Sequence, residues 1–367
     1  MHRAITTDEL LSLLASTPEL VVLDVRTREE VADWSLPKVL NIPVEELATR
    51  LDEVPLGCPL AVVCLRGRRS QEAGGILDEA GIDALVVEGG MSAWGRTLAV
   101  AELEVGSATV VQLRRVGKGC LSYLIGVDGQ CAVIDPSGDL ARLEAEIDRR
   151  EWTVTAVLDT HLHADHLSLA RQLAARHGAS VIMNDDGYGF DVVTAAPRTR
   201  IEIAGGFGLE VRATPGHTTG SSSFLLDGGV LFSGDTLFVE SVGRPDLENR
   251  AEEFARHLYR SLHEELASLP DEIVVLPAHM GARVDVVPGE LVGTTLGELR
   301  DRLEALRLDE AAFVAWAAGQ AVAWPPNYHA IVEANRGLAE LSPEEAVELE
   351  LGPNRCAVTA TMRSVGG

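Results

Sequence analysis

Three histidines and one aspartate stand close together in the C-terminal half of this chain, as His161, His163, Asp165 and His166. Imidazole nitrogens and carboxylate oxygens are common metal ligands in proteins. Crowding such polar groups on one short segment is unfavourable unless they share a partner. A bound metal ion is the simplest partner that would explain the pattern.

The flanking residues predict how this segment is held in place. Residues 154–158 are apolar and partly β-branched, as expected of a buried strand. Residues 167–177 are predicted to form a helix. The ligand candidates therefore lie on a loop at the end of a strand, a position from which many proteins present functional side chains.

Three further ligand candidates each follow a predicted strand. They are His217 after residues 209–212, Asp235 after residues 229–231, and His279 after residues 272–275. Glycine or proline stands close to each of them and sets the turn. A buried structural histidine would explain one such residue, but it would not explain four separate motifs in this order.

The order of these motifs resembles the metallo-β-lactamase superfamily over residues 108–340. The resemblance implies an α+β fold, an αββα sandwich with the site at the strand ends. Within this superfamily, a resemblance to persulfide dioxygenases implies that one Fe(II) ion per chain is held by His161, His217 and Asp235, because two histidines and a carboxylate are typical of non-haem iron. The remaining candidates would surround this ion, or hold a second one if two zinc ions bind instead: His163, Asp165, His166 and His279.

A second reactive group lies in the first part of the chain. Cys64 stands between a predicted strand at residues 60–63 and a predicted helix at residues 71–80. Backbone N–H groups at such a turn stabilise a thiolate. Positive charge that would attract anions is added by Arg66, Arg68 and Arg69. A buried cysteine beside a solvated arginine turn is the alternative explanation.

The surrounding motifs resemble a single-domain rhodanese. They are Asp24-Val25-Arg26, the C-x-x-G-x-R-S segment at 64–70, and Glu88-Gly89-Gly90 followed by Trp94. The resemblance implies an α/β domain, a parallel sheet with helices on both faces. It also implies that Cys64 carries a sulfane sulfur as a persulfide. The cradle would be the loop of Leu65, Arg66, Gly67, Arg68, Arg69 and Ser70.

Two further segments resemble persulfide dioxygenases. The first is 236–247, in which Arg244 is the candidate anion clamp and Asp246 its neighbour; a surface pair of these two residues is the alternative. The second is 324–337, which is similar to the tail of persulfide dioxygenases fused to rhodanese domains. The resemblance implies oxidation of a low-molecular-weight thiol persulfide by O₂ to sulfite, with sulfur passing between persulfide, sulfite and thiosulfate at Cys64.

Two other functions stay open from the sequence. One is a glyoxalase II-like thioesterase with two zinc ions, and the other is a rhodanese sulfur carrier with a non-catalytic metal domain. Residues 303–308 lack the Asn-Pro-Arg/Ala-Leu stretch usual in the dioxygenases. Fusion of a rhodanese to a persulfide dioxygenase would keep a reactive sulfur intermediate at high effective concentration, which favours the dioxygenase.

Length and composition predict a soluble protein of two domains. The chain has 367 residues, of which 46% are hydrophobic and 24% are charged. We expect a first domain at 1–98, a linker at 99–107, a second domain at 108–340 and a C-terminal extension at 341–367. The net charge of −25 argues against nucleic acid or an anionic membrane as a partner. The oligomeric state is left open, a homo-oligomer included.

Cysteine usage and the N-terminus indicate a cytoplasmic protein. The five cysteines are irregularly spaced and form no C-x-x-C pair, which argues against a disulfide framework. Apart from Cys64, we expect the cysteines to be small apolar fillers. The first residues show no signal-peptide pattern.

Overall fold

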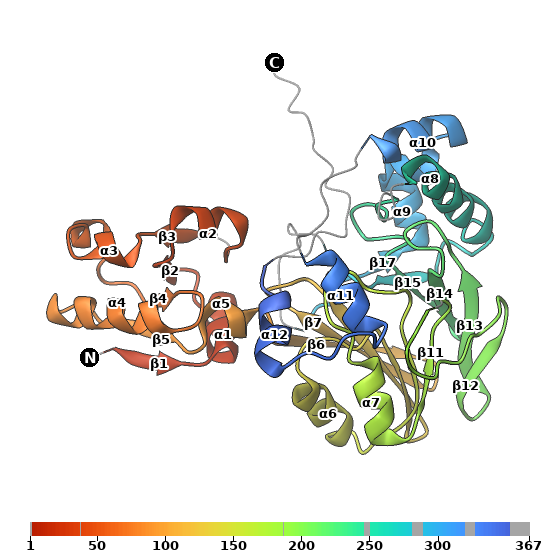
Figure 1. Cartoon of the computed structure of the whole chain (residues 1–367), viewed down its shortest axis with the longest axis horizontal. Helices are drawn as coiled ribbons and strands as arrows, with labels where there is room; N and C mark the ends of the chain where they lie inside the picture. The colour runs from red at the N-terminus through yellow and green to blue at the C-terminus, as the bar shows by residue number, and fades with distance from the viewer. Residues whose placement is uncertain are drawn as a thin grey trace.

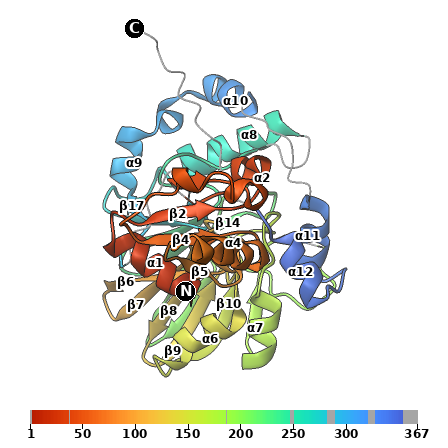
Figure 2. The same ribbon diagram turned by 90° about the vertical axis from the view of Figure 1, so that its left-hand side faces the viewer.

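The computed structural model describes residues 2–36, 38–185, 187–245, 250–280, 289–319 and 327–352. One five-stranded sheet and two six-stranded sheets form within them. The five-stranded sheet lies on one side of the molecule, and the two larger sheets lie together on the other (Figures 1 and 2). No helix among the described residues is long and apolar enough to span a membrane.

The N-terminal sheet is parallel throughout, with strand order β1-β5-β4-β2-β3. Its strands are β1 (Arg3–Ile5), β2 (Val21–Asp24), β3 (Val39–Asn41), β4 (Leu60–Val63) and β5 (Leu85–Val87). Its helices are α1 (Thr7–Ser16), α2 (Arg28–Asp33), α3 (Val44–Leu47), α4 (Arg68–Glu79) and α5 (Gly90–Trp94), with a short turn at Leu51–Glu53. Adjacent residues of β2 enter different cores, Val22 with α1 and α5 and Leu23 with α3 and α4. Helices therefore cover both faces, as predicted.

The two larger sheets hold the rest of the strands. The first contains β6 (Leu98–Val105), β7 (Ala108–Arg115), β8 (Leu121–Val127), β9 (Gln130–Ile134), β10 (Thr153–Leu158) and β11 (Ser180–Ile182). The second contains β12 (Arg200–Ala204), β13 (Phe207–Ala213), β14 (Ser222–Leu226), β15 (Val230–Gly234), β16 (Val274–Pro277) and β17 (Thr294–Thr295).

The helices of this part of the chain lie around the two sheets. They are α6 (Leu140–Asp148), α7 (Ala170–His177), α8 (Ala251–Arg260), α9 (Leu296–Arg302), α10 (Glu310–Ala318), α11 (Tyr328–Asn335) and α12 (Pro343–Leu349), with shorter turns at Ser261–Glu265 and Glu304–Arg307. Helices α6 and α7 pack on the first sheet, and α8, α9 and α10 pack on the second (Figure 1). Between the sheets, the rings of Tyr123 and Phe232 lie 4.9 Å apart at their centroids. The predicted αββα sandwich is confirmed.

The segment assigned to a linker is instead a strand. Residues 98–105 form β6, which pairs with β7 along its whole length. Its residues alternate between more and less exposed positions, and Glu102 points to solvent. The alternation of apolar and polar residues is visible in this segment of the sequence, but the glutamates among the apolar residues make the strand pattern weak. We propose that the second domain begins at Leu98 rather than at residue 108.

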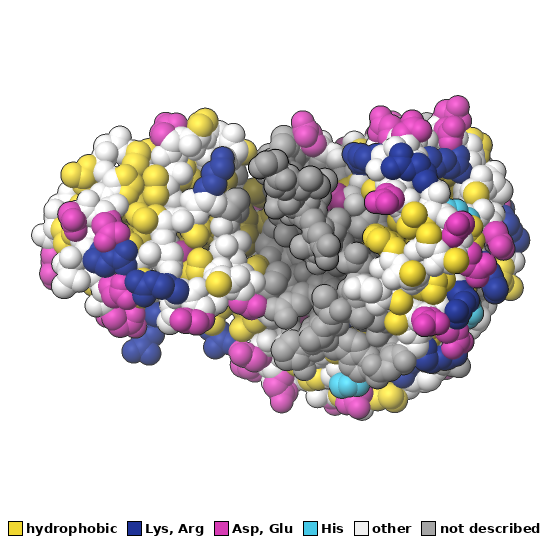
Figure 3. Space-filling model, turned by 90° about the horizontal axis from the view of Figure 1, so that it is seen from above, with side chains coloured by type: hydrophobic (Ala, Val, Ile, Leu, Met, Phe, Trp, Pro, Cys, Tyr) yellow, Lys and Arg dark blue, Asp and Glu magenta, His cyan; other side chains and the backbone are white. Residues whose placement is uncertain are grey.

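Residues beyond α12 connect the two halves of the molecule. Arg115 and Lys118 of the second domain bind the side chain and the carbonyl of Glu350 at 3.0 and 2.8 Å. Leu351 packs against the core of the N-terminal domain. Figure 1 shows α12 beside this junction, and Figure 3 shows acidic and basic side chains mixed over both halves. The C-terminal segment is therefore part of the folded structure at least to residue 352.

Candidate metal centre and thiol pocket

Three side chains that follow different strands meet at one end of the two larger sheets. His161 lies on the loop after β10, His217 on the loop after β13, and Asp235 directly after β15. His161 Nε2 lies 3.6 Å from Asp235 Oδ2, and His217 Nε2 lies 3.4 Å from the same oxygen. A divalent ion with bonds of about 2.1 Å holds neighbouring ligands roughly 3.0 to 3.5 Å apart. The three atoms are therefore spaced as ligands of one metal ion.

The hydrogen bonds of this triad leave its facing atoms available to a cation. His161 Nε2 and Asp235 Oδ2 are buried and have no hydrogen-bond partner among the described residues. A buried polar atom without a partner costs about 1–3 kcal/mol, and a bound ion would remove that cost. His217 donates from Nδ1 to the carbonyl oxygen of Arg244 at 3.0 Å, which leaves the lone pair on Nε2 for a metal. The triad therefore fits a metal ion.

Burial and neighbouring charges together set the protonation of these three groups. Burial, aided by the neighbouring His163, lowers the pKa of His161 well below its ordinary value. Burial also lowers the pKa of His217. Burial opposes ionisation of Asp235, but the charges of His279 and His161 outweigh it and hold the pKa of Asp235 well below its usual range. Near neutral pH the triad thus has neutral imidazoles and an ionised carboxylate, the forms that bind metal ions.

Two aspartates contact the ring of His163 and orient it. Its Nε2 lies 3.1 Å from Asp135 Oδ1 and 3.9 Å from Asp159 Oδ1, while its Nδ1 is buried with no hydrogen-bond partner in the described part of the chain. Asp135 also accepts a hydrogen bond from the N–H of Thr160 at 2.7 Å, so it fixes both the ring and the loop. Burial raises the pKa of Asp159 to about 6. From the sequence, Asp135 is only the end of a strand, and nothing in its spacing indicates this role.

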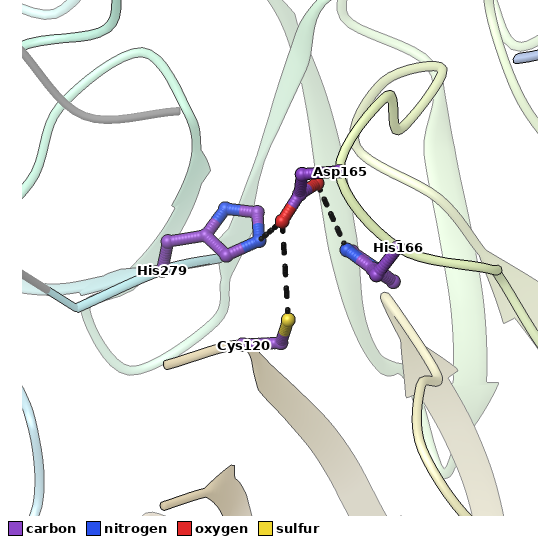
Figure 4. Close-up of side chains that lie close together, drawn as sticks. All are labelled: Cys120, Asp165, His166 and His279. Atoms are coloured by element: carbon purple, nitrogen blue, oxygen red, sulfur yellow. Dashed lines mark hydrogen bonds and ion pairs between the residues drawn. The ribbon is translucent and has the colours of Figure 1, made fainter. Parts of the chain in front are cut away.

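A second cluster joins the other three ligand candidates to a cysteine (Figure 4). One ligand atom from each of Cys120, Asp165, His166 and His279 lies within 4.8 Å of the others. Asp165 contacts His166 Nδ1 through Oδ1 and His279 Nε2 through Oδ2, both at 3.0 Å. The prediction that Cys120 is an apolar filler is wrong, because its buried thiol lies among these polar side chains.

Charges within this second cluster balance one another. Burial opposes a thiolate at Cys120, but the charges of His166 and Arg115 lower the pKa of Cys120 to about 5. Burial also opposes protonation of His166, but Cys120 and Asp165 raise the pKa of His166 to about 10. The cluster therefore combines two acidic groups with two imidazoles.

Asp185 joins the two loops that carry the histidines of the triad. It accepts hydrogen bonds from the N–H of Leu162 at 3.0 Å and from the N–H of Gly220 at 2.9 Å. A side chain at Gly220 would bring its Cβ within 2.3 Å of the Asp185 carboxyl carbon, so the close approach requires glycine. The carboxylate thus fixes the distance between the loops of His161 and His217.

We expect Asn335→Ala to lower the free energy of unfolding by about 2–4 kcal/mol. The Asn335 amide donates to the carbonyl oxygens of His163 and His166 at 2.9 and 2.8 Å, and its oxygen accepts from Ser168 N at 2.9 Å. Removing it leaves three backbone groups unpaired, at about 1 kcal/mol or more each. All three belong to the loop between β10 and α7, which we call the metal loop. Urea unfolding of metal-free protein measures the change. Asn327→Ala is the control, because that side chain donates one hydrogen bond, to Leu349 O, away from the metal loop. Equal losses would mean that Asn335 does not hold the loop.

Arg244 lies beside the triad, and its carbonyl oxygen accepts the hydrogen bond from His217. Its side chain is 2% exposed, so the alternative of a surface arginine is wrong. Its role as an anion clamp stays a prediction. Asp246, its expected neighbour in substrate binding, lies outside the described residues, as does part of the 324–337 segment.

Cys64 directly follows β4 and lines a cavity of about 420 Å³. Its Sγ accepts a hydrogen bond from Gly67 N at 3.1 Å and lies 3.5 Å from Ser70 Oγ. Helix α5 packs directly on this loop, because Met91 N donates to Cys64 O at 2.8 Å. A Cβ at Gly90 would lie 2.1 Å from the same carbonyl oxygen, so this part of the Glu-Gly-Gly motif requires glycine.

The three arginines of the loop line the same cavity, together with Leu65. Arg69 forms a two-point ion pair with Glu30, at 2.7 Å for both contacts, and Arg66 pairs with Glu348 of α12. Arg68 is exposed at the start of α4. The positive charge predicted from the sequence is therefore partly matched by carboxylates. The exposed pair of Arg66 with Glu348 is solvated and weak, so another anion can compete for Arg66.

Comparison with known proteins divides the chain into the same two parts as the structure. The sequence model of the metallo-beta-lactamase superfamily matches residues 115–279, and that of the rhodanese-like domain matches residues 6–97. The chain is 31% identical over 187 residues to the probable metallo-hydrolase YqgX of Bacillus subtilis, a match that covers 45% of this chain and 87% of that protein. It is 32% identical over 185 residues to the human mitochondrial persulfide dioxygenase ETHE1, covering 47% of this chain and 70% of that protein.

Solved structures agree with the sequence matches. The crystal structure of ETHE1 from Myxococcus xanthus aligns with a TM-score of 0.55 at 30% identity, covering 62% of this chain and 97% of that one. A metallo-beta-lactamase from Staphylococcus aureus aligns with a TM-score of 0.56 at 30% identity, covering 61% of this chain and 70% of that one.

Proposed function

Because the chain belongs to the metallo-β-lactamase superfamily and carries an N-terminal rhodanese domain, we propose that it oxidises a low-molecular-weight thiol persulfide with O₂. The observation that carries the proposal is the convergence of His161, His217 and Asp235 on one point in a chain similar to persulfide dioxygenases. Persulfide, O₂ and water would give thiol, sulfite and two protons. The sulfane sulfur loses four electrons, and O₂ accepts them.

The triad suits one Fe(II) ion per chain. Two imidazoles and one carboxylate leave other coordination positions open, and Fe(II) bound there would supply the redox chemistry that activates O₂. The protein's own part is to keep Asp235 ionised and both Nε2 atoms unprotonated. The charges of His279 and His161 hold the pKa of Asp235 low, and burial lowers the pKa of His161 and His217. The Arg244 carbonyl keeps the His217 proton on Nδ1. The loop contacts of Asp185 and Asn335 hold these ligands in place before the ion binds.

Cys64 would exchange sulfur between sulfite, thiosulfate and thiols. Sulfite attacks the outer sulfur of a Cys64 persulfide, the S–S bond of the persulfide breaks, and the outer sulfur leaves joined to the sulfite sulfur as thiosulfate. The electron pair of the broken bond stays on Cys64 Sγ, and the Gly67 N–H at 3.1 Å stabilises that thiolate. The step also runs in reverse, so thiosulfate can load the cysteine.

A glyoxalase II-like thioesterase is the second candidate, because the cluster of Asp165, His166 and His279 lies beside the triad and offers ligands for another ion. Elemental analysis and activity assays of protein produced without added metal separate the two. We expect about one iron per chain and O₂ uptake with persulfide. Two zinc ions at these histidine and aspartate sites, thioester hydrolysis and no O₂ uptake after iron loading would replace the proposal with the thioesterase.

A further inference from the structure

An ion pair joins the Cys64 cavity to a helix of the second domain. Arg66, Arg68 and Arg69 line this cavity beside the thiol. The guanidinium of Arg66 pairs with the carboxylate of Glu348, which lies on α12. Figure 1 shows α12 beside the N-terminal domain. One of the three positive charges of the cavity is therefore paired by a residue from outside the domain that carries the cysteine.

Two contacts just beyond Glu348 hold the end of α12 in this place. The carboxylate of Glu350 accepts hydrogen bonds from Arg115 Nη1 and from Leu167 N, both at 3.0 Å. Leu351 packs against the core of the N-terminal domain. The end of α12 cannot move away from the cavity without breaking these contacts. Glu348 is thus kept close to the cavity by the fold, although its own side chain is exposed.

The two ion pairs of the cavity differ in how easily an anion can break them. Arg69 and Glu30 are 27% and 30% exposed and form two contacts of 2.7 Å. Arg66 and Glu348 are 56% and 65% exposed. Water and salt screen an exposed pair more strongly than a half-buried one. An anion that enters the cavity therefore displaces Glu348 from Arg66 more readily than it displaces Glu30 from Arg69.

We propose that Glu348 limits which anions the Cys64 cavity accepts, because its carboxylate occupies Arg66 and a small sulfur oxyanion such as thiosulfate must displace it. The oxyanion gains charge-assisted hydrogen bonds from the guanidinium, but the lost pair with Glu348 offsets part of that gain. A neutral reagent has no use for the cation and is not affected. The proposal rests on the proposed role of Cys64 in sulfur transfer, but binding of an anion beside the thiol can be measured without that reaction.

Glu348→Gln in the full-length protein tests the proposal, since it removes the charge and keeps the length of the side chain. We expect the KM for thiosulfate in sulfur transfer to fall about two- to fivefold with kcat unchanged, as for the loss of an exposed ion pair. High salt should reduce the difference. Glu344→Gln is the matched control, because Glu344 is an exposed carboxylate in the first turn of the same helix, and it should change neither quantity. In an Arg66→Gln background, Glu348→Gln should have no effect, since the pair is already broken.

Alkylation of Cys64 is a second measurement that needs no sulfur transfer. Iodoacetate is an anion and iodoacetamide is neutral, and mass spectrometry separates the Cys64 product from that of Cys58. We expect Glu348→Gln to raise the ratio of the iodoacetate rate to the iodoacetamide rate at Cys64 by about two- to fivefold, through the same pair.

The outcomes of the two measurements separate this proposal from the proposed function. A ratio that stays the same or falls, an unchanged KM in protein that transfers sulfur, or an equal effect in the Arg66→Gln background would overturn the proposal. So would a Cys64 thiol that reacts with neither reagent, because the cavity would then be closed to small anions. If thiosulfate transfers no sulfur but the ratio rises as expected, only the proposed role of Cys64 fails.

Discussion

Asp235→Ala is expected to remove iron from the triad and to abolish persulfide-dependent O₂ uptake. Asp235 supplies the one anionic ligand of the triad, and its Oδ2 lies 3.4 Å from His217 Nε2 and 3.6 Å from His161 Nε2. Alanine leaves two neutral imidazoles, which bind a divalent ion poorly. Loss of several kcal/mol of metal stabilisation corresponds to a fall in kcat/KM of about three decades or more.

The measurement is iron content by elemental analysis together with O₂ uptake, after the same iron-loading step for every variant. Asp227→Ala is the matched control, because Asp227 is a partly exposed carboxylate paired with Arg200. That variant should keep its iron and its activity. Circular dichroism establishes that Asp235→Ala is folded. A folded Asp235→Ala protein with full iron content would refute the assignment of Asp235 as a ligand.

Cys64→Ser is expected to abolish sulfur transfer from thiosulfate to thiols while O₂ uptake with persulfide continues. A serine hydroxyl cannot form a persulfide, so transfer should fall by about a thousandfold or more, as for removal of a covalent nucleophile. Cys64 belongs to the N-terminal sheet and is not part of any of the ligand clusters of the two larger sheets. The change is therefore expected to leave the iron site intact.

Transfer is measured with thiosulfate and a thiol, and O₂ uptake is measured separately with a persulfide supplied directly. Cys58→Ser, a change at a half-buried cysteine of the same domain, should affect neither rate. If O₂ uptake also disappears in folded Cys64→Ser protein, the persulfide must pass through Cys64 before oxidation, and the two sites act as one.

The ligand candidates could be predicted because each follows a strand whose apolar pattern is visible in the sequence. His161, His217, Asp235 and His279 come after β10, β13, β15 and β16, and both larger sheets present those strand ends at the same edge. The fold class could be predicted from the order of the motifs, because that order is a property of the residues themselves and can be recognised without knowing how distant segments pack.

Other parts of the site depend on contacts that the sequence does not encode locally. Cys120 joins the second cluster only because β7 and β8 bring it opposite His279. Asp135 acts on His163 across a parallel strand pair, β9 with β10. The resemblance of residues 324–337 to persulfide dioxygenases draws attention to the segment that contains Asn335. The hydrogen bonds of Asn335 to the metal loop are visible only in the structure.

The ratio of O₂ consumed to sulfite formed tests the central claim most directly. Iron-loaded protein is supplied with glutathione persulfide as the probe, and both quantities are followed in the same sample. We predict one sulfite for each O₂, with no hydrolysis of a glutathione thioester by the same preparation. Thioester hydrolysis without O₂ uptake, or O₂ uptake without sulfite, would contradict the account.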